Sequence, residues 1–308
     1  MNRRAFLESM AGLAAAVPGG VLSAKGAADA ARSRVVVVRR GEPAEMFRRG
    51  IAALGGITAF VKPGQRVVVK PNIGWDRTPE FAANTHPDLV GEIVRQCLAA
   101  GAAGVTVFDH TCNAWKKCYE HSGIEAAVKA AGGTMAEAHE VSAYREAACP
   151  EAVRMKQAKI HHAILEADVF INVPILKNHG GAKMTAALKN FMGLVWDRQF
   201  MHRNNLAQCI ADAPLYRKPT LNVVDAYRTM QTNGPLGVGL TDVRTLRYQL
   251  LSTDPVAIDV LAAKLLRFPV ESIPYLALAA KNGLGILEEA QMEVIRLEAG
   301  APEPVVKG

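Results

Sequence analysis

Aromatic residues, cysteines and long apolar runs are all scarce in this sequence of 308 residues, and each scarcity excludes a class of protein. Aromatic side chains account for 6% of the residues, and the 5 cysteines include no Cys-x-x-Cys pair. This cysteine usage does not support a disulfide scaffold, a zinc or iron–sulfur motif, or a c-type haem site. No long apolar run follows the first 30 residues, so we expect that the mature chain does not span a membrane.

The charge balance favours small anionic ligands over nucleic acids. The sequence has 36 Lys and Arg residues against 29 Asp and Glu residues, a formal net charge of +7. The basic residues are scattered, without a dense run interleaved with aromatic residues, so we expect no nucleic-acid partner. A mild basic excess suits an anionic small molecule better. The length and the 50% hydrophobic content are those of a folded enzyme or binding protein.

The first 30 residues resemble a twin-arginine signal peptide. The motif lies in Arg3, Arg4, Phe6 and Leu7, and a soft apolar stretch and an Ala-x-Ala site follow it. An amphipathic N-terminal helix is the alternative interpretation. The resemblance implies that the twin-arginine machinery exports the folded protein, and hence a periplasmic location. We therefore expect residues 1–30 to be a signal peptide and residues 31–308 to be the folded domain.

Strand-like and helix-like segments alternate through that domain. β-branched and apolar runs predict strands over residues 35–38, 66–70, 104–108, 168–173, 221–225, 248–252 and 292–297. Apolar residues at helical spacing predict helices over residues 46–54, 87–100, 124–131, 185–194, 205–210 and 256–266. This alternation predicts an α/β fold, with mainly parallel sheet and helices on both faces in Rossmann-like layers. No repeat or linker marks a second domain, and a subdivision near residue 150 stays open.

Polar residues that directly follow the predicted strands are candidate site residues, because ligands of parallel sheets bind beyond the carboxyl ends of the strands. Lys70 and Asn72 end one strand, and the lysine can direct its ammonium group at an anion. Asp109 and His110 follow the next strand, and Asp225 ends a later one. Aspartate and histidine are ligand types for metals, and histidine also transfers protons near neutral pH.

The segment from residue 172 to residue 193 carries the strongest pattern. Gly180 and Gly181 form a turn whose backbone N–H groups can approach a ligand closely, and we expect a helix to begin through Lys183 and Thr185. Residues 177–196 contain no acidic residue but three lysines, which are Lys177, Lys183 and Lys189. A glycine-rich turn, a helix N-terminus and uncompensated lysines predict a site for an anion. The order of residues is not that of the phosphate-loop motif.

Three local predictions follow from residue chemistry. Thr85 is a candidate N-cap for the helix that begins near Pro87, and Asp254 is a candidate N-cap for the helix over residues 256–266. In an oxidising compartment, Cys112 and Cys118 are candidates for a disulfide, with free thiols as the alternative.

Several motifs together resemble the family of domain of unknown function 362, over roughly residues 35–285. They are Lys70-Pro71-Asn72, Thr85-His86-Pro87, Lys177-Asn178-His179, the run of residues 181–190, and residues 253–259. Many members of that family look like iron–sulfur proteins with a ferredoxin-type cysteine cluster, which this chain lacks. A second resemblance is to nickel-pincer lactate racemases. The segment Gly180-Gly181-Ala182-Lys183 is similar to their Gly-Gly-Arg-Lys segment, with Ala182 in place of arginine. That resemblance implies Lys183 as a cofactor tether, His202 as a metal ligand and His110 as a catalytic histidine.

These observations predict an exported enzyme that binds an anionic small molecule or a metal-containing cofactor in a cleft. The expected catalytic residues are His110, His179 and Lys183. The expected ligand-binding residues are Lys70, Asn72, Lys177, Gly180, Gly181, Lys189 and Asn190. The expected metal ligands are Asp109, His202 and Asp225. The alternatives are a periplasmic anion-binding or accessory protein without catalysis, and an iron–sulfur or redox-associated protein.

Overall fold

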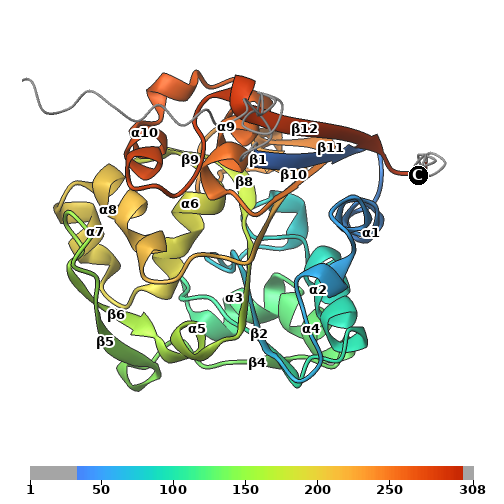
Figure 1. Cartoon of the computed structure of the whole chain (residues 1–308), viewed down its shortest axis with the longest axis horizontal. Helices are drawn as coiled ribbons and strands as arrows, with labels where there is room; N and C mark the ends of the chain where they lie inside the picture. The colour runs from blue at the N-terminus through green and yellow to red at the C-terminus, as the bar shows by residue number, and fades with distance from the viewer. Residues whose placement is uncertain (1–32, 301–308) are drawn as a thin grey trace, which may run out of the picture. The chain divides into compact units, whose positions relative to one another are not determined.

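The predicted α/β fold with a mainly parallel sheet is present in the computed structural model, which describes residues 33–300 (Figure 1). The strand order of its ten-stranded sheet is β12-β1-β11-β10-β7-β2-β3-β4, with β8 and β9 continuing beside β10. The strands are β1 (Ser33–Arg39), β2 (Arg66–Pro71), β3 (Gly104–Val107), β4 (Thr134–Met135), β7 (Val169–Val173), β8 (Ile175–His179), β9 (Lys183–Thr185), β10 (Leu221–Met230), β11 (Val243–Ser252) and β12 (Met292–Glu298). The predicted signal peptide lies outside the described residues.

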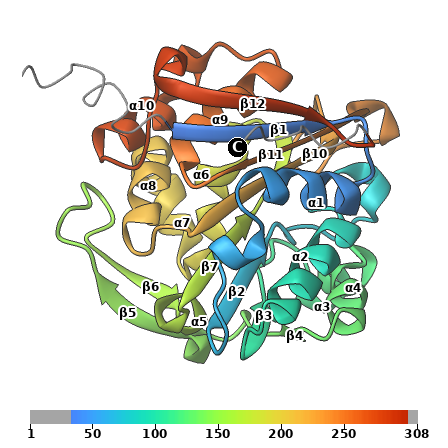
Figure 2. The same ribbon diagram turned by 45° about the vertical axis from the view of Figure 1, so that its right-hand side comes forward.

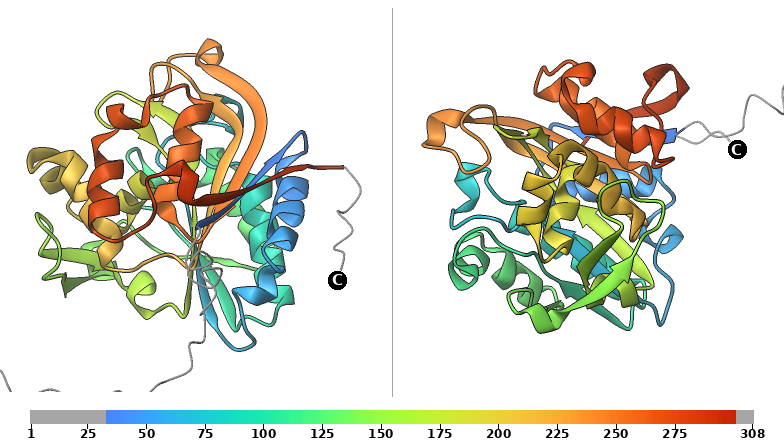
Figure 3. Two further views of the ribbon diagram at one scale, coloured as in Figure 1. Left: turned by 45° about the horizontal axis from the view of Figure 1, so that its top comes forward. Right: turned by 90° about the vertical axis from the view of Figure 1, so that its left-hand side faces the viewer.

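Most neighbouring strands in this sheet are parallel, and three pairs of strands are antiparallel. β11 pairs antiparallel with both β1 and β10, and β9 pairs antiparallel with β8. β5 (Tyr144–Ala148) and β6 (Gln157–His161), which the sequence pattern did not predict, form a separate antiparallel hairpin (Figure 3). The strands β10 and β11 are also longer than predicted, because their ends extend beyond the apolar runs.

Helices cover both faces of the sheet, as predicted (Figure 2). One face carries α1 (Pro43–Ala53), α2 (Pro87–Ala99), α3 (Trp115–His121) and α4 (Ile124–Ala130). The other carries α6 (Ala187–Asn190), α8 (Leu206–Asp212), α9 (Pro255–Leu265) and α10 (Pro274–Lys281). Two further helices, α5 (His162–Glu166) and α7 (Arg198–Arg203), complete the set that is described. No helix among the described residues has both the length and the apolar content needed to cross a membrane.

The two faces of the sheet build two separate apolar cores because side chains alternate along a strand. In β2, Val67 and Val69 pack into the core beneath α1, α2 and α4, whereas Val68 packs into the core on the opposite face. A strand that is buried on both faces needs apolar residues at consecutive positions. This requirement explains the valine runs from which the strands were predicted.

Local capping chemistry confirms one predicted N-cap and corrects the other. The Asp254 carboxylate accepts hydrogen bonds from the N–H groups of Val256 and Ala257 at 2.8 Å, as an N-cap does. At α2, however, the cap is His86, and the hydroxyl of Thr85 instead bridges two strand ends. It accepts from the N–H of Asn72 at 2.8 Å and donates to the carbonyl of Val173 at 2.7 Å. The thiols of Cys112 and Cys118, proposed as a disulfide, are both free.

The predicted helix over residues 185–194 is wrong at its start. The Gly180-Gly181 turn closes a β-hairpin, in which Lys177 of β8 lies opposite Thr185 of β9. Helix α6 begins only at Ala187, and a 3-10 turn over Phe191–Leu194 follows it. A glycine pair is compatible both with a β-hairpin turn and with the start of a helix. The local sequence therefore does not decide between them, and the pairing of β8 with β10 and β9 does.

Candidate functional site

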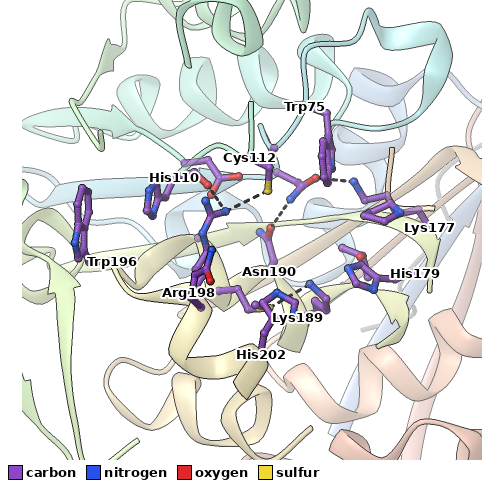
Figure 4. A pocket seen from close by; sticks show the side chains of 18 of the residues that line it. Trp75, His110, Cys112, Lys177, His179, Lys189, Asn190, Trp196, Arg198 and His202 are labelled. Atoms are coloured by element: carbon purple, nitrogen blue, oxygen red, sulfur yellow. Dashed lines mark hydrogen bonds between the residues drawn. The ribbon is translucent and has the colours of Figure 1, made fainter. Parts of the chain in front are cut away.

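A pocket of about 840 Å³ lies where several strands of the sheet end (Figure 4). Loops after β2 and β3, the hairpin of β8 and β9, and the segment from α6 to α7 supply its walls. The residues that line it are Asn72, Gly74, Trp75, Asp109, His110, Cys112, Lys177, His179, Thr185, Lys189, Asn190, Met192, Gly193, Trp196, Asp197, Arg198, Gln199, His202 and Pro235. Figure 4 shows Lys177 and His179 on one side and His110 and Trp196 on the other, with Lys189 and Asn190 between them.

A buried ion pair supports one wall of the pocket. The Nζ atom of Lys70 lies 2.8 Å from Oδ1 of Asp109, and both side chains are shielded from solvent. Burial lowers the pKa of Lys70, and the negative charge of Asp109 opposes that change. The second carboxylate oxygen of Asp109 accepts from the N–H of Ile73 at 2.7 Å. The charges of Lys70 and Asp109 therefore compensate each other, and neither residue is free to hold a separate ion.

Asparagine side chains connect this ion pair to the rest of the pocket. The Asn190 oxygen accepts from Nζ of Lys70 at 2.9 Å, and the Asn190 amide nitrogen donates to Asn172 at 2.8 Å. The Asn72 oxygen accepts from Nζ of Lys177 at 3.0 Å. Because these amides are held by neighbours on different strands, they fix the positions of both lysines.

Three cationic side chains at the pocket have no carboxylate partner within the described part of the chain. Lys177 is 1% exposed, and its ammonium donates to Asn72 Oδ1 and to the carbonyl of Ala83. Lys189 is half-buried and contacts the sulfur of Met192 at 3.2 Å. Burial lowers the pKa of Lys177 to about 7 and that of Lys189 to about 8.

Arg198 is the third of these cations. Its guanidinium donates to the carbonyls of His110 and Thr111 at 2.8 and 2.6 Å, and to Sγ of Cys112 at 3.3 Å. These contacts anchor the guanidinium to the loop after β3 without neutralising it. The pocket consequently carries an excess of positive charge, which favours an anionic ligand.

Hydrogen bonds fix the protonation site of His110. Its Nδ1 lies 3.2 Å from the carbonyl of Val195, and a carbonyl only accepts, so Nδ1 carries the proton. The other ring nitrogen, Nε2, is then an unprotonated acceptor. Burial and the nearby charge of Arg198 lower the pKa of His110, which keeps the ring neutral at pH 7.

His179 is held in the opposite tautomer. Its Nδ1 accepts from the backbone N–H groups of Gly181 and Ala182 at 3.1 and 3.0 Å, so the proton resides on Nε2. Burial, together with the charges of Lys189 and Lys177, lowers the pKa of His179 to about 3. One neutral histidine of the pocket therefore offers an acceptor, and the other offers a donor.

Aromatic rings form the wall around His110. The indole of Trp196 stacks on the imidazole with centroids 5.2 Å apart and planes 5° apart, and Tyr144 packs against both rings. Trp75 lies on the other side of the pocket, and the centroid of its ring is 6.0 Å from Nζ of Lys177. Sequence reasoning gave Trp196 no role, because a single tryptophan in a loop has no periodic neighbours that would mark it.

Most of the predicted ligand-binding residues meet in this pocket, but five predicted site residues do not line it, which are Lys70, Gly180, Gly181, Lys183 and Asp225. Lys183 is exposed, and its backbone has φ of 66°, which interrupts the alternation of side chains along β9. The N–H of Gly180 donates to Gly234, and that of Gly181 donates to His179, so neither amide faces a ligand. Lys183, Gly180 and Gly181 therefore remain predictions that the geometry does not support.

The helix N-terminus predicted to receive an anion already holds one from the protein itself. The buried carboxylate of Asp259 accepts from the N–H groups of Ala187 and Leu188, the first residues of α6, at 2.6 and 3.0 Å. Burial raises the pKa of Asp259 to about 7, whereas the two amide donors oppose that change. The N-terminus of α6 is therefore not available to an external anion.

The predicted metal ligands do not come together. Asp109 is paired with Lys70, His202 is exposed at the pocket, and Asp225 is buried elsewhere, where it accepts from the N–H groups of His86 and Tyr227. Within residues 33–300, no group of three or more His, Cys, Asp and Glu side chains is placed to hold a metal ion. With Lys183 outside the pocket lining, the residues also do not fit a lysine-tethered nickel cofactor.

The family model described as "Domain of unknown function (DUF362)" matches residues 67–264, and the chain belongs to this family. One curated relative is the thylakoid-associated protein sll1697 of Synechocystis sp., which is 25% identical over 247 residues, covering 77% of this chain and 74% of the relative.

Two solved structures are similar at 12% identity. The lactate racemase apoprotein from Thermoanaerobacterium thermosaccharolyticum matches with a TM-score of 0.47, over 77% of this chain and 57% of that one. A protein from Thermotoga maritima matches with a TM-score of 0.44, over 78% and 60%. This chain thus spans less than two thirds of either solved chain.

Proposed function

We propose that the protein is an enzyme that binds an anionic small molecule in this pocket and transfers a proton through His110. The observation that carries the proposal is the joint presence of three uncompensated cations and two neutral histidines of opposite tautomer. A pocket with cations alone would be that of a binding protein without catalysis. The acceptor on His110 adds a group that can remove a proton from the bound molecule.

The cations would bind and orient the anion. Lys177 and Lys189 are held by Asn72 and Met192, and Arg198 is anchored by backbone carbonyls, so their positions are fixed before a ligand arrives. Preorganised donors in a site that excludes water bind charge more strongly than mobile donors in water. An anion placed among these residues would also favour the protonated forms of both lysines.

The two histidines would have different roles: His110 would accept the proton, and His179 would hold the ligand by a hydrogen bond. Nε2 of His110 is unprotonated at neutral pH and can accept a proton from a ligand atom within hydrogen-bond distance. Nε2–H of His179 can donate a hydrogen bond to an oxygen of the same ligand. The guanidinium of Arg198 lies next to the loop of His110 and would stabilise negative charge that develops there.

The binding half of this proposal is tested by isothermal titration calorimetry with inorganic phosphate and with small carboxylates. Lys177→Met removes one cation of the pocket and should weaken binding at least about tenfold, since a hydrogen bond to a charged group contributes about 1.5–3 kcal/mol. Lys117→Met, which removes an exposed lysine on α3, is the matched control for net charge and should bind like the wild type. Equal affinity in all three proteins would refute the assignment of the pocket.

The catalytic half is tested by ¹H NMR of bound ligands in D₂O. The wild type should exchange a carbon-bound proton of its ligand for deuterium. His110→Asn retains a donor toward the carbonyl of Val195 but has no counterpart of Nε2, so exchange should fall at least about 100-fold. If this variant exchanges the proton at the wild-type rate, His110 is not the base. If the wild type itself exchanges no proton, a binding or accessory protein without catalysis becomes the better assignment.

We also propose export by the twin-arginine pathway to the periplasm, which rests on the sequence of residues 1–30. Replacing both Arg3 and Arg4 by lysine should retain the protein in the cytoplasmic fraction. Continued appearance of this variant in the periplasmic fraction would contradict the proposal.

A further inference from the structure

Thr185 of β9 presents a buried hydroxyl that has no hydrogen-bond partner within the described part of the chain. The residue lines the pocket and is only 3% exposed. A buried polar group without a partner costs about 1–3 kcal/mol, so a native structure seldom retains one unless another molecule satisfies it. The hydroxyl therefore marks a position where a ligand atom is expected.

The register of the hairpin places Thr185 opposite a residue with a buried ammonium group. Thr185 lies directly opposite Lys177 in the antiparallel pairing of β8 and β9, and opposite side chains of such a pair share one face. The ammonium of Lys177 has three N–H groups, of which the bonds to Asn72 and Ala83 use two. Within residues 33–300, one N–H of Lys177 thus remains available at the pocket that Thr185 also lines.

Two further groups add free donors on the same side. Within the described part of the chain, Lys189 makes one hydrogen bond, to the sulfur of Met192, which leaves two of its N–H groups. Nε2–H of His179 has no partner among residues 33–300, because Nδ1 makes the bonds to the backbone. Figure 4 shows Lys189 next to His179, and the charges of Lys177 and Lys189 both act on His179. All of these unmet groups donate hydrogen bonds.

We propose that Thr185 and Lys177, flanked by Lys189 and His179, form a subsite for the phosphate group of a phosphorylated small molecule. The inference rests on the proposed function and specifies its substrate class. Two lysines match the charge of a phosphate monoester, which is close to −2 at neutral pH, better than that of a carboxylate. The free donors of Lys177, Lys189, His179 and Thr185 also outnumber the roughly four lone-pair positions of a carboxylate. The three oxygens of a phosphate can accept hydrogen bonds from all of these donors.

The test compares inorganic phosphate with acetate, by isothermal titration calorimetry, on the full chain and on three threonine variants. Thr185→Val removes the hydroxyl at nearly constant volume and should weaken phosphate binding about tenfold or more. Thr185→Ser retains the hydroxyl and should bind within about threefold of the wild type. Thr229→Val is the matched control, because Thr229 is equally buried but accepts a bond from Gln231 outside the pocket.

The thermal stability of the ligand-free variants gives a second readout. Thr185→Val should be as stable as the wild type or more stable, because it deletes a hydroxyl that lacks a partner. Thr229→Val should be less stable, because it leaves the amide of Gln231 without its acceptor. If Thr185→Val instead loses stability as Thr229→Val does, its hydroxyl has a partner in the protein and the subsite assignment is wrong.

The outcomes separate this inference from the proposed function. If Lys177→Met loses phosphate binding but Thr185→Val retains it, the subsite is refuted and the anion pocket stands. Tighter binding of acetate than of phosphate would overturn the phosphate assignment alone. If the wild type binds neither anion and exchanges no proton, both proposals fail.

Discussion

Replacing Lys177 by methionine should reduce the dependence of stability on pH between pH 7 and pH 9. Lys177 titrates near pH 7 in the folded protein because it is buried without a carboxylate, whereas an unfolded lysine titrates near 10.5. The unfolded chain therefore binds a proton that the folded chain has released. By linkage, the free energy of unfolding rises with pH throughout this window.

The size of the effect follows from the two pKa values. Integrating the difference in bound protons from pH 7 to pH 9 gives about 2 kcal/mol of stability from Lys177 alone. Lys70 and Lys189 contribute in the same direction to the wild type and to the variant. Their repulsion with Lys177 is lost in the variant, which changes the difference in the same direction. Hydrogen bonds lost from Asn72 and Ala83 lower the stability of the variant equally at every pH.

Urea denaturation of ligand-free protein at pH 7, 8 and 9 measures this difference. The wild type should gain about 2 kcal/mol more than Lys177→Met across the series. Lys117→Met, at an exposed position of α3, controls for the change in net charge. Identical gains in the wild type and in Lys177→Met would show that the buried ammonium keeps its proton, and the electrostatic argument for the pocket would fail.

Three other predictions follow from the geometry of the site and its surroundings. The affinity for phosphate should fall as the pH rises from 7 to 9, because Lys177 and Lys189 lose their protons there, and calorimetry across that range would show a constant affinity if the lysines do not bind the anion. Gly193→Ala should cost about 2–4 kcal/mol in denaturation experiments, since a Cβ atom at this position collides with Asp109 and comes within 2.7 Å of Nζ of Lys70. Asp254→Ala should cost about 1 kcal/mol through the lost N-cap of α9, and an unchanged denaturation midpoint would contradict that role.

The sequence was sufficient for the parts of this structure that depend on neighbouring residues. Runs such as residues 35–38 and 66–70 predict strands because a strand buried on both faces needs consecutive apolar residues. The rule that ligands bind beyond strand ends then selected Asn72, His110 and Lys177, which do share the pocket.

Features that depend on distant partners could not be predicted. The N-terminus of α6 is occupied by Asp259, a residue 72 positions further along the chain, and only the tertiary fold brings that carboxylate to Ala187. The tautomers of His110 and His179 are likewise set by a carbonyl at Val195 and by two amides of the hairpin turn. Local patterns contain no information about these contacts, although they determine which nitrogen faces the ligand.

The position of β1 between β11 and β12 has a consequence for the order in which the protein is assembled during synthesis. Both neighbours of this first described strand come from the far end of the sequence, and β11 does not begin until Val243. A nascent chain must therefore carry its valine run unpaired while most of the domain is translated. A product truncated before β11 would expose that run as a bare edge, a preferred site of aggregation. β1 is therefore paired on both sides only in chains that have been translated through β12, and it stays unpaired in products that end before β11.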